Sequence, residues 1–168
     1  MVSRIFLIQA WEKREETMTL FEQINADYIT AYKAKETVRV SVLRLLKTAV
    51  KNRLVELRRP GGTLSDEEML DIVLKEGKQR KDSMSEYEKA GRADLAAKEA
   101  EELAILEAYL PAAMSAEELA SAIEQAVAET GASSPKEMGK VMSALMKTCK
   151  GRVDGKVLSQ AVKDRLSR

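Results

Sequence analysis

Apolar residues in this chain recur at intervals of three and four positions, and no stretch alternates apolar and polar residues as a β-strand does. Three of the repeats begin with Ser or Thr followed three positions later by Glu, at Thr19, Ser65 and Ser115. This pattern is the capping box, in which each side chain satisfies the free backbone N–H of the other residue. Only three prolines and eight glycines interrupt the repeats, so the sequence predicts an all-α protein.

The breaks between the repeats predict two groups of helices. Pro60-Gly61-Gly62, Gly91 and Pro111 each follow a helical repeat and end it. We expect an N-terminal four-helix unit over residues 18–110 and a C-terminal three-helix unit over residues 111–168. Residues 1–17 precede the first capping box and are expected to form a poorly ordered N-terminal extension.

One predicted helix, from about Glu36 to Leu57, is apolar over most of its circumference. Such a helix is expected to be central and to contact two or more others. The strip that remains for solvent is purely cationic. It forms a secondary candidate anion-binding surface, and the alternative is a solvated face paired to acidic helices. The residues of this strip are Arg44, Lys47, Lys51 and Arg58.

The last 35 residues predict two small helices joined by a basic turn over residues 147–152, which we call the elbow. Ser134, with Pro135 and Glu137, predicts the start of the first helix, where Gly139 is expected to allow close helix packing. Asp154 is expected to cap the second, whose apolar stripe begins at Val157. Because clustered Lys and Arg can hold phosphates, the elbow is the main candidate anion-binding site, and the family resemblance described below implies that the anion is a nucleic acid. The candidate residues in and around this turn, which we call the elbow set or elbow cations, are Lys140, Lys147, Lys150, Arg152 and Lys156.

The residue types present exclude most catalytic chemistry. Histidine is absent and Cys149 is the single cysteine, which excludes Ser-His and Cys-His pairs, an intramolecular disulfide and a His/Cys metal site. Cys149 is interpreted as an incidental thiol at a helix end. Gly61-Gly62 lacks the spacing of a phosphate-binding loop, and the paired carboxylates are expected on helix surfaces. We therefore expect no intrinsic catalysis, no metal and no cofactor.

Charge is balanced overall, at +1, but it is unevenly distributed. Residues 33–59 hold nine basic and two acidic side chains, and residues 133–168 hold nine basic and three acidic ones. Between them, residues 60–110 hold seven basic and thirteen acidic side chains. The basic blocks face either this acidic middle or an anionic partner. No segment is long enough to span a bilayer, and a lone cysteine suits a reducing compartment, so a cytoplasmic protein without membrane contact is expected.

Five segments resemble the GatB/YqeY family: MGKVM (138–142), KGRVDGK (150–156), and residues 44–56, 86–111 and 115–119. The family is named after the tail domain of one component of the glutamine-dependent tRNA amidotransferase and after small stand-alone proteins. The resemblance implies a C-terminal unit like that tail domain, which binds tRNA or a tRNA-handling complex by shape and backbone. It links the chain to a carbon–nitrogen ligase with glutamine as amido-N-donor, but not to the reaction itself. The alternative is a protein–protein adaptor that uses the acidic helices or an apolar groove between the units.

Overall fold

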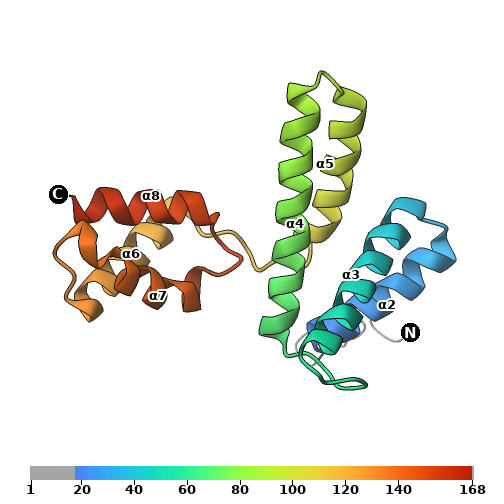
Figure 1. Ribbon diagram of the computed structural model, residues 1–168, viewed down its shortest axis with the longest axis horizontal. Coiled ribbons are helices and arrows are strands. Elements are labelled where there is room, and N and C mark those ends of the chain that lie inside the picture. The colour runs from blue at the N-terminus through green and yellow to red at the C-terminus, as the bar shows by residue number, and fades with distance from the viewer. Residues whose placement is uncertain (1–17, 168) are drawn as a thin grey trace, which may run out of the picture. The chain divides into compact units, whose positions relative to one another are not determined.

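The computed structural model describes residues 18–167, apart from the side chain of Lys147, and these residues form seven α-helices, one short 3-10 helix and no strand (Figure 1). The all-α class predicted from the sequence is confirmed. The chain divides into two compact units, one ending at Tyr109 and the other beginning at Leu110. The helices are α2 (Leu20–Ala34), α3 (Thr37–Glu56), α4 (Asp66–Lys89), α5 (Ala93–Glu107), α6 (Ala116–Thr130), η1 (Pro135–Glu137), α7 (Met138–Cys149) and α8 (Gly155–Leu166).

The first unit is built from two antiparallel helix pairs, α2 with α3 and α4 with α5 (Figure 1). Helix α3 contacts α2, α4 and α5, which confirms the prediction that it is central. Its apolar arc is nevertheless wider than its buried face, since Leu45 is 42% exposed and Val55 is 70% exposed. The fully buried core of this unit includes Ile24, Leu43, Leu46, Met69 and Leu106.

Polar contacts join helices of the first unit both between the two pairs and within one of them. The Leu20 backbone N–H donates to Asp66 Oδ1 at 2.9 Å, which joins the N-terminus of α2 to that of α4. Between α4 and α5, the buried Arg80 donates from Nε to Glu102 Oε2 at 2.8 Å and lies 3.5 Å from Glu99 Oε2. A buried guanidinium is tolerated here because it is paired and hydrogen-bonded.

Helices α6, α7 and α8 enclose the core of the second unit. Its buried side chains come from all three helices and include Cys149, which is 1% exposed. The thiol therefore has a packing role that its position at a helix end did not indicate. Gly131 has a φ of +63° and ends α6 in the left-handed conformation that glycine adopts without strain, whereas Gly151, with φ +76°, lies in the turn that follows α7, after the C-cap residue Lys150.

The start of α7 differs from the sequence prediction. Ser134 makes no side-chain capping bond, and residues 135–137 form the separate 3-10 helix. Glu137 instead accepts from the Ser133 backbone N–H at 3.0 Å. The interpretation of Gly139 as a close-packing position is wrong, since a Cβ there would meet nothing within 4 Å. Val157 was expected in the apolar stripe of α8 but is 55% exposed, while Asp154 caps that helix as predicted.

Candidate nucleic-acid interface

The elbow gathers some of the predicted cations but not all of them. Lys150 and Arg152 lie in the turn between α7 and α8, and Lys156 lies in the first turn of α8. Lys147 is in the last turn of α7, and its side chain lies outside the described part of the structure. Lys140 is in the first turn of α7, ten residues before Lys150, which corresponds to about 15 Å along a helix axis. Lys140 therefore lies apart from the turn.

Arg152 is engaged inside its own unit. Its Nε donates to the Ala112 carbonyl at 3.0 Å, and Nη2 lies 3.4 Å from both carboxylate oxygens of Glu118. Its backbone carbonyl accepts from the Met114 N–H at 3.1 Å. The Ser115 backbone N–H holds the pKa of Glu118 below its ordinary value, and the charge of Arg152 adds to that effect. Arg152 thus fastens residues 112–114, which lead into α6, to the elbow.

The other described elbow cations differ in what surrounds them. Lys140 Nζ lies 3.2 Å from Glu137 Oε1, and Lys150 is half-buried with an interaction of its own. Asp154 accepts from the backbone N–H groups of Lys156 and Val157, so a carboxylate already occupies the N-terminus of α8. Among the described side chains of the elbow set, Lys156 alone is exposed and without an internal partner.

The cations of α3 are arranged differently from those of the elbow. Arg44, Lys47 and Lys51 are spaced by three and four residues, which places them on one face of the helix. Arg44 and Lys51 are exposed, and none of the three forms an ion pair with any residue between 18 and 167. Arg58 lies beyond the end of α3, in a left-handed conformation with φ +54°, and is exposed in the turn that follows.

Two tyrosines of α2 border this cationic face. Lys47 Nζ lies over the Tyr28 ring, 4.5 Å from its centroid, in a cation–π contact. The Tyr28 and Tyr32 rings are stacked with centroids 6.3 Å apart, and Tyr32 is 64% exposed. We call Tyr28, Tyr32, Arg44, Lys47 and Lys51 together the basic face. Sequence reasoning missed its tyrosines, although their spacing of four residues on a helix is the signal that could have found them.

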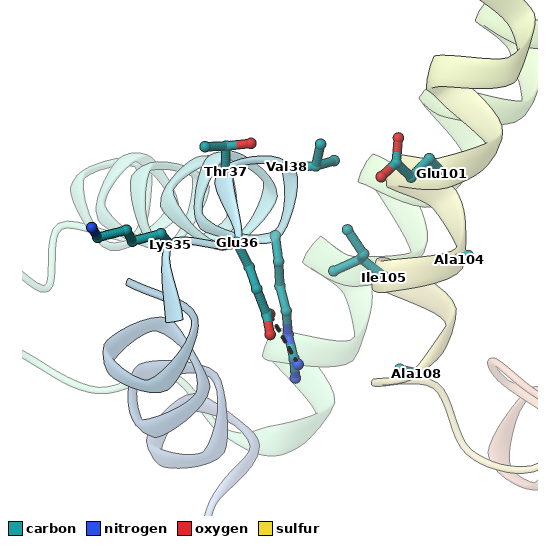
Figure 2. A pocket seen from close by; sticks show the side chains of 9 residues that line it. Lys35, Glu36, Thr37, Val38, Glu101, Ala104, Ile105 and Ala108 are labelled. Carbon is teal, nitrogen blue, oxygen red and sulfur yellow. Dashed lines mark ion pairs between the residues drawn. The ribbon is translucent and has the colours of Figure 1, made fainter. Parts of the chain in front are cut away.

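A groove lies elsewhere on the same unit, between the start of α3 and the second half of α5 (Figure 2). Its volume is about 740 Å³, and its lining includes Val38, Ala104, Ile105 and Ala108. Figure 2 shows Ile105 extending from α5 toward the beginning of α3.

The wall of this groove is held in place by a half-buried hydrogen-bond cluster. The Tyr109 hydroxyl donates to Asp27 Oδ2 at 2.6 Å, and Arg39 Nη2 lies 3.3 Å from the same oxygen. Burial raises the pKa of Tyr109 above its ordinary range, and the bond to Asp27 adds to that shift. The cluster joins α2, α3 and the residues that follow α5, because Asp27 lies in α2, Arg39 in α3 and Tyr109 two residues after the end of α5.

Comparison with known proteins supports the resemblance seen in the sequence. The family described as Yqey-like protein matches residues 21–166, which is most of the chain. The chain belongs to this Yqey-like family. A curated relative, Altered inheritance of mitochondria protein 41, mitochondrial, from Kluyveromyces lactis, is 32% identical over 143 residues. That match covers 83% of this chain and 72% of the relative.

The family match includes both the basic face and the elbow, so it does not choose between the two surfaces. Within residues 18–167 of this Yqey-like protein, no three acidic or cysteine side chains are grouped so that they could hold a metal ion. Nor does any described helix have the length and apolar character needed to cross a bilayer.

Proposed function

We propose that this Yqey-like protein binds structured RNA, with tRNA as its first candidate, as an accessory to tRNA handling. The observation that carries the proposal is the set of three cations on α3 that have no ion-pair partner among residues 18–167. Lys and Arg that neutralise phosphates provide most of the affinity of sequence-independent nucleic-acid binding. The link to tRNA rests on the resemblance to the amidotransferase tail domain.

The basic face has the larger role in this proposal and the elbow a smaller one. A cation already paired inside the protein must exchange that partner for a phosphate, so Arg152 and Lys140 gain less from RNA than Arg44 or Lys51 do. Lys156 is the elbow residue best placed to add a phosphate contact. The proposal includes no catalytic step. It requires a compartment that contains tRNA, either the cytoplasm or, as the name of the K. lactis relative says of that protein, mitochondria.

The experiment is fluorescence anisotropy with labelled bulk tRNA at 50 and 200 mM salt. Three phosphate contacts correspond to a loss of affinity of roughly 20- to 40-fold across that interval. The variant R44A/K47A/K51A is expected to bind more weakly at low salt and to lose most of this salt dependence. A matched control, K75A/K78A/K98A, removes the same charge from exposed positions of α4 and α5 and is expected to bind like the wild type. Equal binding by wild type and R44A/K47A/K51A would reject the basic face.

The groove favours a second candidate function, a protein–protein adaptor. Its apolar lining, including Val38 and Ile105, is open to solvent without an occupant from residues 18–167. The variant I105K places a charge in the groove and leaves the basic face intact. If wild-type protein ignores tRNA at low salt, and a partner identified by mass spectrometry is lost on I105K substitution, the adaptor function replaces the RNA-binding one.

A further inference from the structure

We propose that Tyr32, stacked on Tyr28, is a platform for an unpaired RNA base, so that the basic face prefers single-stranded or loop segments to duplex. This inference rests on the proposed RNA-binding function and deepens it by naming the part of the RNA that is recognised. The chemistry is stacking of a base on an exposed phenol ring while neighbouring cations hold the phosphates on either side.

Tyr32 presents an exposed ring whose position is restrained by a neighbouring tyrosine. Tyr28 is half-buried, with Lys47 over its ring and Tyr32 stacked with it, so two neighbours contact it. Tyr32 lies one helical turn further along α2 and is 64% exposed. The contact with Tyr28 limits the rotation of the Tyr32 side chain, so its remaining surface is presented to solvent with less conformational freedom to lose on binding.

The cations of α3 lie near the two tyrosines of α2. Helices α2 and α3 run antiparallel and are joined at residues 35–36, so one turn forward on α2 corresponds to one turn back on α3. Lys47 Nζ reaches the Tyr28 ring, and Arg44 lies one turn nearer the junction on α3, in the same direction along the helix pair as Tyr32 lies from Tyr28. One cation therefore contacts the tyrosine pair, and a second lies one turn away on the same helix face, a combination of cations and aromatic side chains that proteins use to bind single strands.

Single-stranded and duplex RNA differ in which of these groups they can use. In an A-form duplex the base faces are stacked inside the helix, and the phosphates are what a flat helical surface can reach. A duplex can therefore use Arg44, Lys47 and Lys51 but gains nothing from the face of Tyr32. An unpaired base can use both, and stacking on an aromatic side chain strengthens binding by about fivefold or more.

The experiment measures binding of two fluorescein-labelled RNAs to the full chain by anisotropy, a 12-nucleotide single strand without self-complementarity and the 12-base-pair duplex of the same sequence. Y32A is expected to weaken single-strand binding by about fivefold or more and to change duplex binding by less than about twofold. Y32F keeps the ring and is expected to bind like the wild type. Y32L keeps apolar area without an aromatic face and is expected to behave like Y32A. Circular dichroism checks that each variant is folded, which is expected at so exposed a position.

The outcomes separate this inference from the proposed function. If R44A/K47A/K51A loses affinity for both RNAs while Y32A keeps wild-type affinity for the single strand, stacking is wrong and RNA binding by the basic face stands. If Y32A weakens both RNAs equally, or Y32L binds like Y32F, the aromatic face is not the recognised feature and the inference is overturned. If wild-type protein binds neither RNA at low salt, the inference and the proposed function fail together.

Discussion

Arg152 has a structural role in the elbow rather than an RNA-binding one, and its replacement tests this assignment. The sequence assigned it to the nucleic-acid site, but its guanidinium holds the Ala112 carbonyl at 3.0 Å and faces Glu118. The variant R152A removes both contacts. We expect it to loosen the attachment of residues 112–114 to the elbow. We expect tRNA affinity to stay within about twofold of the wild-type value, because this cation already has partners inside its own unit.

The size of the effect follows from the contacts. The hydrogen bond to the Ala112 carbonyl is worth about 1 kcal/mol, and the exposed ion pair with Glu118 adds little to it. The Met114 N–H bonds to the carbonyl of the same arginine, so its exchange with solvent reports opening of this attachment. A loss of about 1 kcal/mol corresponds to amide exchange roughly fivefold faster.

The assay is hydrogen–deuterium exchange at Met114, combined with tRNA anisotropy. R152K keeps the charge but lacks the forked geometry, so it is expected to exchange nearly as fast as R152A. K156A, at an exposed neighbouring position, is the control and is expected to leave Met114 exchange unchanged. Unchanged exchange in R152A, together with a large loss of tRNA affinity, would refute the structural assignment.

Three further predictions concern stability, each measured by chemical or acid unfolding followed by circular dichroism. L106A empties a position that is 2% exposed and is expected to lower the free energy of unfolding by about 2–5 kcal/mol, whereas V157A, at a position 55% exposed, should change it by less than about 0.5 kcal/mol. G77A adds a Cβ at ordinary contact distance within α4 and should stabilise by about 0.5–1 kcal/mol, while G91A forces φ +68° on alanine and should destabilise. The Ser65 backbone N–H lowers the folded-state pKa of Glu68. Ionised Glu68 therefore contributes to the stability of the folded state above about pH 4.5, and this contribution is lost as pH falls through the lower folded-state pKa. E68Q should therefore make the decline of stability in acid shallower, and an unchanged acid profile would contradict this.

Local signals in the sequence predicted the helices well. The capping boxes at Thr19, Ser65 and Ser115 are all present, with each Ser or Thr and its Glu bonding reciprocally. These motifs can be read from the sequence because both partners lie within four residues of each other. The central position of α3 followed from the width of its apolar arc for a similar reason, since helical periodicity is a local property.

Features that depend on distant residues could not be predicted in the same way. The partners of Arg152 are 40 and 34 residues away, so the sequence showed its charge but not its contacts with the Ala112 carbonyl and Glu118. Gly139 and Val157 were misjudged because helical spacing does not say whether a neighbouring helix approaches that point. The tyrosines of the basic face were missed because stacking beside Lys47 depends on how α2 and α3 are paired.

The most direct test of the account is to map where tRNA touches the protein, using backbone amide chemical shifts of the isotope-labelled full chain during titration with tRNA. If the basic face binds tRNA, the largest shifts are expected in α3 between Arg44 and Lys51 and in α2 around Tyr32, with smaller ones near Lys156. Shifts confined to the lining of the groove, or to the acidic surfaces of α4 and α5, would contradict it. The absence of any shift at low salt would do so as well.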